Sequence, residues 1–400
     1  GLPKGKRIKS YELTIDTKSD NFNIFALTGG ILTAIGIAFW IAVGVFDVSF
    51  GGKTEVPSVG ILMMENRGDE EDEFWASSIT EDLIVKVAGA GLIRVAPMKE
   101  ILEVDIKQSF EEIANKLRVK YILTSSIYKK KEGFDLHCQL IEAKSGNSKY
   151  ANKWSESIDK TPTIVGNLAD NILKSLKVST KQDIAKAPTT NVEAYEYYLK
   201  AKYKLDKYKY YHYVYYDSPM FKEDINIARG LLQNAIEIDN NIFAAKMLLG
   251  RSYAIERESG QPISISEKDI FENVLKQAEQ LGDKYWIGRS LRNVGNMYYW
   301  DEPKKAIKYY ERSLEIAQEI GDKLNMAHSL HNLGWQYTYS GDINKSIYFH
   351  TQSSKIRKII GDALGVGMSF QLIGFSHKIL GQYDMAMDFY VRSLNIREEI

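Results

Sequence analysis

Few residues of this chain have the types and spacing that an active site or a metal site requires. Residues 69–73 form an acidic run; carboxylates can bind cations, but without regular ligand spacing this run favours the first turn of a solvated helix. His328 and His331 have helical spacing, yet no third ligand is evident, so histidines lining a groove or surface are favoured over a metal site. P-loop, G-x-S-x-G and H-E-x-x-H motifs are absent. The sequence predicts no catalytic residue, cofactor or metal here.

Charge and cysteine content narrow the functional classes. The chain has 52 basic and 52 acidic side chains, so it shows no overall bias toward nucleic acid. Its single cysteine, Cys138, excludes an internal disulfide and lies in an alternating apolar pattern typical of a buried strand. Ten tyrosines between Tyr195 and Tyr216 are interleaved with lysines. This favours packing within a helix pair, with an exposed loop at 208–216, over base stacking; contact with a peptide or a membrane surface is the alternative.

The most conspicuous element is an uncharged run over residues 21–46. As a helix at ~1.5 Å per residue it reaches about 39 Å, enough to cross a ~30 Å hydrocarbon core. Basic residues gather before the run, so the positive-inside rule places residues 1–20 in the cytoplasm and residues 47–400 outside it. The sequence therefore predicts a single transmembrane helix in a bacterial inner membrane; a cleaved signal peptide and a buried core helix are the less favoured alternatives.

A stripe of small residues runs along the same segment at every fourth position: Ala26, Gly30, Ala34, Ala38 and Ala42. Such spacing lets two helix backbones approach closely and predicts packing in a homodimer. The alternative is that glycine and alanine are simply common in membrane helices.

A second segment, residues 52–179, predicts a small α/β domain. Strands are expected over 56–64, 92–97, 121–131, 134–143 and 149–158, with helices over 68–91, 109–119 and 161–176. The 109–119 helix begins with a Ser-x-x-Glu capping box. The stretches PSVGILMMENRGDEEDEFWASSITEDLI and ANKLRVKYILTSSIYKKKEGFDLHCQLIEAKSGN resemble the TolB-amino-terminal-like domain of bacterial envelope and signalling proteins. That resemblance implies a position between a membrane helix and helical repeats.

Residues 190–400 repeat with a period of about 40. Gly295, Gly334 and Gly374 recur within similar segments, and Ala306, Ser346 and Ala386 follow them in register. Paired helices with a close-approach glycine and a small residue resemble tetratricopeptide repeats. The resemblance implies an all-α superhelix of about five helix pairs, the last cut short by the end of the sequence. The predicted fold class is therefore multi-domain: a transmembrane helix, a TolB-like α/β domain and a tetratricopeptide superhelix.

The resemblance also implies a concave groove that binds a peptide or protein. Its expected lining lies on the first helix of each pair: Arg289, Arg292, Asn296 and Tyr299; His328, His331, Trp335 and Thr338; Met368, Gln371, Phe375 and Lys378. Basic and aromatic side chains there favour an acidic segment with large apolar residues. A carboxylate clamp built on Arg292, Asn296 and Asn332 is a less favoured alternative.

These features predict a membrane-anchored sensor or interaction module that regulates an upstream cytoplasmic domain. The opening residues, GLPKGKRIKSYELTID, resemble the closing strand of a class III adenylate or guanylate cyclase, which implies that a longer protein is an enzyme. Two alternatives stay open: a transcriptional regulator with an upstream winged helix, and an envelope scaffold without a signalling role. No nucleic-acid partner is expected for this segment.

Overall fold

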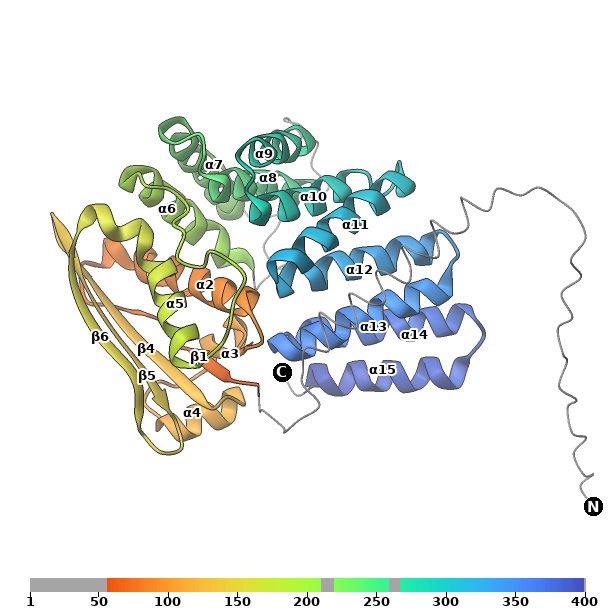
Figure 1. The fold of residues 1–400 in the computed structure, drawn as a ribbon, viewed down its shortest axis with the longest axis horizontal. Coiled ribbons are helices and arrows are strands. Elements are labelled where there is room, and N and C mark those ends of the chain that lie inside the picture. The colour runs from red at the N-terminus through yellow and green to blue at the C-terminus, as the bar shows by residue number, and fades with distance from the viewer. Residues whose placement is uncertain (1–55, 210–218, 259–266, 399–400) are drawn as a thin grey trace, which may run out of the picture. The chain divides into compact units, whose positions relative to one another are not determined.

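The structure is a computed structural model that describes residues 56–209, 219–258 and 267–398. These residues fall within one compact unit, Glu55–Ile400. It contains a mixed sheet with its helices, followed by a long array of paired helices (Figure 1).

The sheet has the order β3-β1-β4-β5-β6, and β2 also pairs with β4. Its strands are β1 (Ser58–Ile61), β2 (Glu65–Asn66), β3 (Arg94–Val95), β4 (Tyr121–Lys129), β5 (Gly133–Glu142) and β6 (Ser148–Ser157). Strands β3, β1 and β4 are parallel, whereas β4, β5 and β6 are antiparallel. The alternating apolar residues of β5 are buried, Cys138 among them, and burial raises the pKa of its thiol to about 11.

The helices around the sheet are η1 (Glu70–Asp72), α2 (Glu73–Ala90), α3 (Met98–Leu102), α4 (Phe110–Leu117), η2 (Ile158–Thr163) and α5 (Ile164–Ser175). The acidic run therefore lies at a helix start, as the sequence predicts. The capping box of α4 is confirmed: the Ser109 hydroxyl accepts from the backbone N–H of Glu112, and the Glu112 carboxylate accepts from the backbone N–H of Ser109.

Ten helices, α6 to α15, follow among the described residues. They are α6 (Val192–Lys209), α7 (Pro219–Ile238), α8 (Phe243–Glu258), α9 (Glu267–Leu281), α10 (Lys284–Met297), α11 (Pro303–Ile320), α12 (Lys323–Tyr339), α13 (Ile343–Ile360), α14 (Ala363–Ile379) and α15 (Tyr383–Glu398). Successive helices pack against each other as pairs.

Each repeat glycine lies against a ring on the second helix of its own pair. A Cβ on Gly295 would lie 2.6 Å from Tyr310, and one on Gly334 would lie 2.6 Å from the ring of His350. Gly374 faces Tyr390 in the same way. The missing side chain is therefore what lets the two helices of a pair approach each other.

A buried serine recurs on the second helix of each of the last three pairs. The hydroxyl of Ser313 donates to the carbonyl of Gly288 at 2.7 Å, and Ser353 and Ser393 donate in the same way to the carbonyls of Ala327 and Gly367. Because all three serines are almost fully buried, each bond ties the two helices of a pair together in a dry environment.

The sheet unit and the first repeats share one continuous hydrophobic core, which runs from Val59 of β1 to Tyr253 of α8. A buried cation reinforces this junction. Lys202 Nζ of α6 lies 2.8 Å from the carboxylate of Glu81 on α2 and 2.6 Å from that of Asp206. The first repeats are therefore fused to the sheet unit through a shared hydrophobic core.

The sequence-based fold class and location need correction. Among the described residues, no helix combines the length and apolar character needed to cross a bilayer. The long helices α2, α6, α7, α11 and α13 all carry charged side chains along their length. The structure therefore supports a mostly helical repeat superhelix with a sheet unit, in place of a single-pass inner-membrane protein. Residues 1–20, the run 21–46 with Ala26, Gly30, Ala34, Ala38 and Ala42, and the tyrosine loop 210–216 lie outside the described residues.

Candidate functional site

A cavity of about 920 Å³ lies between the sheet unit and the later repeats. One wall comes from α2 and from the segment Val95–Lys99, which joins β3 to α3. The other wall comes from α12, α14 and α15, together with the turn between α13 and α14. Its volume falls within the ~300–1,000 Å³ typical of ligand sites.

The walls are mainly apolar. Ile84 and Val85 of α2 and Met98 of α3 face the cavity from the sheet unit, and Trp335 and Phe375 face it from the repeats. Phe375 and Met368, which also lines the cavity, are each 39% exposed. Large apolar side chains that remain this accessible inside a cavity are unusual for a packed interface and mark a candidate binding surface.

Five of the residues predicted to line a groove are brought together here: His331 and Trp335 of α12, and Met368, Gln371 and Phe375 of α14. The ring of Trp335 stacks on Tyr339 at 5.6 Å. The side-chain oxygen of Gln371 accepts a hydrogen bond of 2.6 Å from Arg397 of α15.

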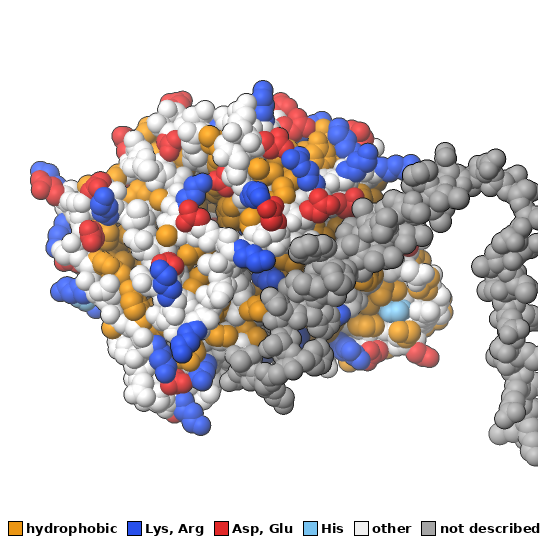
Figure 2. All heavy atoms as spheres, in the orientation of Figure 1, with side chains coloured by type: hydrophobic (Ala, Val, Ile, Leu, Met, Phe, Trp, Pro, Cys, Tyr) orange, Lys and Arg blue, Asp and Glu red, His pale blue; other side chains and the backbone are white. Residues whose placement is uncertain are grey.

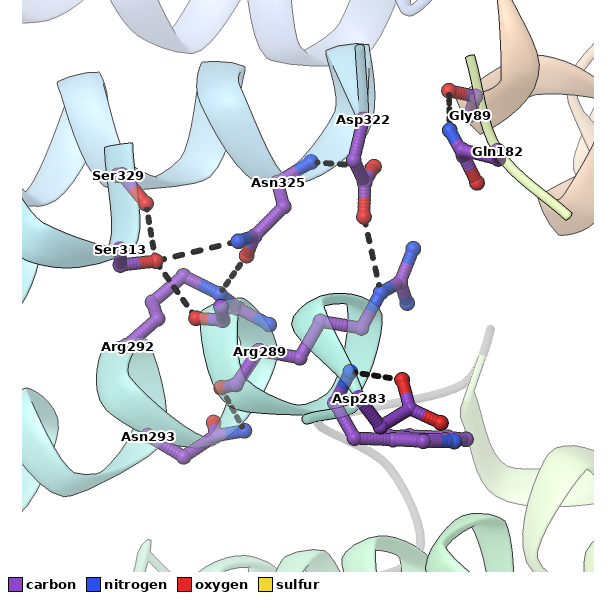
Figure 3. A network of polar contacts seen from close by, with 12 residues as sticks. Gly89, Gln182, Asp283, Arg289, Arg292, Asn293, Ser313, Asp322, Asn325 and Ser329 are labelled. Atoms are coloured by element: carbon purple, nitrogen blue, oxygen red, sulfur yellow. Dashed lines mark hydrogen bonds and ion pairs between the residues drawn. The ribbon is translucent and has the colours of Figure 1, made fainter. Parts of the chain in front are cut away.

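Arg289 and Arg292 of α10 do not line the cavity; they belong to an adjoining polar network (Figure 3). Arg289 lies 3.1 Å from the carboxylate of Asp322, which also caps α12 by accepting from the N–H of Asn325. Burial alone would lower the pKa of Arg289, but Asp322 and Tyr285 together outweigh it and the pKa is raised. Arg289 is thus already paired within the chain.

Arg292 has a different environment. Its guanidinium donates to the neutral side chain of Asn325 at 2.9 Å. Burial, with the charges of Arg289 and Arg251, lowers the pKa of Arg292 to about 10. Arg292 is therefore a buried cation whose hydrogen-bond partner carries no charge.

The remaining predicted groove residues bind neighbouring helices or lie apart from the cavity. Asn296 accepts hydrogen bonds of 2.9 Å from both Tyr310 and Asn332. Asn296 and Asn332, two of the three residues of the alternative carboxylate clamp, are therefore hydrogen-bonded to each other. Tyr299 packs edge-on against Trp300 and Tyr339, Thr338 donates to the Gly334 carbonyl, and Lys378 is exposed on α14.

The histidines of α12 lie in a dry and positive environment. Burial, with Arg292 and Arg357 nearby, lowers the pKa of His328 well below its usual value. Burial lowers the pKa of both His331 and His350 to about 3, and Arg357 adds to the effect. The rings of His331 and His350 lie 5.5 Å apart, and Nδ1 of His331 is buried with no hydrogen-bond partner in the described part of the chain.

A metal centre has no support in the described part of the chain, where no group of three or more candidate ligands gathers. The positive charge of Arg357 beside the histidine pair would also oppose a bound cation. His331 instead lines the cavity as a neutral imidazole.

Sequence reasoning missed the sheet-unit wall and Arg397. The wall depends on contacts between distant residues: Gln182 donates to the Gly89 carbonyl at 2.8 Å (Figure 3), and Lys186 pairs with Asp283 at 2.6 Å. A sequence pattern within one element or one repeat does not predict contacts between residues so far apart in the sequence. Arg397 lies on α15, the second helix of the last pair. The groove residues were predicted only on the first helix of each pair, so this prediction did not include Arg397.

Comparison with known proteins identifies the repeats. Residues 301–359 match the tetratricopeptide repeat family, and no curated protein matches the sequence. Among solved structures, BtubC from P. vanneervenii is 15% identical, with 52% of this chain and 90% of that chain covered at a TM-score of 0.39. MamA is 20% identical, with 46% and 95% covered at 0.33. TolB from Acinetobacter baumannii is 14% identical, with 30% and 28% covered at 0.25.

Likenesses at such low TM-scores carry no argument about function. The family match does, because tetratricopeptide arrays present extended concave surfaces to other proteins. Residues 301–359 are therefore tetratricopeptide repeats, and the chain contains a protein-interaction module of that type.

Proposed function

We propose that the module binds an extended segment of a partner protein in the cavity between the sheet unit and helices α12 and α14. The observation that carries this proposal is the convergence of Trp335, Met368 and Phe375, from two successive repeats, on one apolar cavity. Aromatic and long apolar side chains in a concave pocket are the usual anchors of a protein interface.

The volume of the cavity limits what enters it. About 920 Å³ accommodates a few side chains of a peptide and not a folded domain. Trp335 and Phe375 offer flat apolar faces, and His331 adds a neutral imidazole beside them. A segment with aromatic or branched aliphatic residues and an exposed backbone suits this combination.

The adjoining charges favour an acidic segment. Arg292 has a neutral partner in Asn325, and burial, together with the charges of Arg289 and Arg251, lowers its pKa. A positive field beside an apolar pocket raises the association rate of acidic ligands and selects against basic ones. The face shown in Figure 2 has basic and acidic side chains interspersed and no broad basic patch of the kind that nucleic-acid binding requires.

The proposed output is signalling: partner binding would regulate an upstream domain, for which a nucleotide cyclase remains the prediction from the sequence. Fusion of the sheet unit to the first repeats supports a mechanical link, because a ligand that touches both walls changes how they pack. The alternatives are a transcriptional regulator with a winged-helix domain and a scaffold without a signalling output. The sequence of the full-length protein would distinguish these hypotheses.

The binding proposal is tested with a fluorescein-labelled six-residue peptide of leucine and phenylalanine that carries one glutamate. Anisotropy titration should show saturable binding to the wild-type chain. Phe375→Ala should weaken it about 30-fold, the effect of losing an anchor worth ~2 kcal/mol. Tyr348→Ala removes a similarly exposed aromatic residue of α13 that does not line the cavity, and it should leave binding unchanged. Equal affinity in all three proteins would refute the proposed site.

A further inference from the structure

Two cations lie on opposite walls of the cavity. Lys99 belongs to α3 of the sheet unit, and Arg397 belongs to α15 of the last repeat. Both side chains are exposed. The structure shows no ion pair between either of them and any carboxylate of the described residues, and the partner of Arg397 is the neutral amide of Gln371.

The acidic residues that line the cavity, Glu81 and Asp362, each form an ion pair with another cation. Glu81 lies 2.8 Å from Lys202, and Asp362 lies 2.5 Å from Arg357. Asp362 also caps α14 by accepting from the N–H of Gly365. The cavity therefore has apolar walls, acids that are already paired, and two cations left for an incoming group.

We propose that Lys99 and Arg397 form a two-sided carboxylate filter, so that the cavity selects a peptide segment bearing a carboxylate next to its apolar anchors. This inference rests on the proposed function and adds its specificity determinants. It also makes the sheet unit part of the recognition surface, because one of the two cations comes from α3.

The exposed positions of Lys99 and Arg397 suit this role. A cation kept in water loses little solvation when it meets a carboxylate, so the pair adds selectivity at low desolvation cost. Apolar contacts with Trp335 and Phe375 would supply most of the affinity, and the cations would reject segments with lysine or arginine at the same position.

The test uses three labelled peptides of identical apolar sequence. One carries glutamate and a C-terminal amide, one carries glutamine and a C-terminal amide, and one carries glutamine and a free C-terminus. The wild-type chain should bind the glutamate peptide about tenfold more tightly than the neutral peptide. The affinity of the third peptide shows whether a C-terminal carboxylate strengthens binding as much as the glutamate side chain does.

Charge-reversal variants then test whether Lys99 and Arg397 cause this selectivity. Lys99→Glu and Arg397→Glu should each abolish the preference for a carboxylate, while the neutral peptide keeps its affinity. Lys358→Glu alters an exposed lysine of α13 that does not line the cavity and should leave the preference intact. Circular dichroism establishes that each variant is folded.

The outcomes separate the two proposals. Equal binding of all three peptides, lost in Phe375→Ala, would overturn the carboxylate filter and leave the binding cavity standing. A preference that persists in both charge-reversal variants would also overturn it. No binding of any peptide would overturn the filter and the proposed function together.

Discussion

The contact between Gly334 and His350 offers a quantitative test of how the repeats pack. A methyl group at Gly334 would lie 2.6 Å from Cε1 and 2.7 Å from both ring nitrogens of His350. His350 is fully buried, so its ring cannot swing into solvent. Gly334→Ala must therefore separate α12 from α13 or distort the ring.

The size of the effect follows from two opposing contributions. Replacing glycine by alanine within a helix gains up to about 1 kcal/mol through backbone entropy. Overpacking a closely packed interface typically costs about 1–3 kcal/mol, and several contacts below 3 Å place this site toward the upper end. We expect Gly334→Ala to lower the free energy of unfolding by about 1–2 kcal/mol.

Gly230 in α7 is the matched control, because a Cβ there would have no heavy atom of the described residues within 4 Å. Gly230→Ala should raise stability by up to about 1 kcal/mol. Urea unfolding followed by circular dichroism measures both variants. His350→Ala in the Gly334→Ala background should remove the clash and recover part of the loss. If Gly334→Ala were as stable as Gly230→Ala, the close-approach account of the repeat glycines would be refuted.

The remaining predictions concern buried charges. Because folding lowers the pKa of His331 and His350 to about 3, the unfolded chain binds more protons between about pH 6.5 and 3. The contribution of these histidines to the free energy of unfolding should therefore be fully present above pH 6.5. It should fall by up to ~1.4 kcal/mol per pH unit per histidine as the pH drops toward 3. His350→Phe should reduce that slope when unfolding is measured across this pH range. Lys202→Met leaves the carboxylate of Glu81 buried without its cation and should cost about 3–5 kcal/mol in urea unfolding. On the same helix, Lys200→Met removes a half-exposed ion pair with Glu196 and a cation–π contact with Phe74, and it should cost less than about 1 kcal/mol. Equal effects of the two variants would contradict the buried-ion account.

The local elements of this fold are readable from the sequence. Alternation of apolar residues predicts β5, the Ser-x-x-Glu motif predicts the start of α4, and the recurring glycines predict the helix pairs. The reason is that each signal depends on neighbours within one element or one repeat. The candidate site is only partly readable for the same reason: Trp335 and Phe375 follow from repeat register, whereas the wall formed by Met98 and Lys99 depends on how α2 and α3 pack against distant repeats.

The structure corrects the expected fold class, and it gives one predicted groove residue a partner within the chain. Arg289 was expected to face a ligand, and its position on a first helix gave no hint that Asp322, in the next repeat, would pair with it. The expected transmembrane fold was inferred from an uncharged run that lies outside the described residues. The described helices carry charged side chains, because their outer faces meet water.

The most direct test of the central claim is hydrogen–deuterium exchange of the full chain with and without the glutamate peptide. A segment held between the two walls should slow amide exchange in two places at once: residues 94–102 of the sheet unit and residues 363–379 of α14. The effect should be absent in Phe375→Ala. Protection confined to other helices, or to only one wall, would contradict a binding site formed jointly by the sheet unit and the repeats.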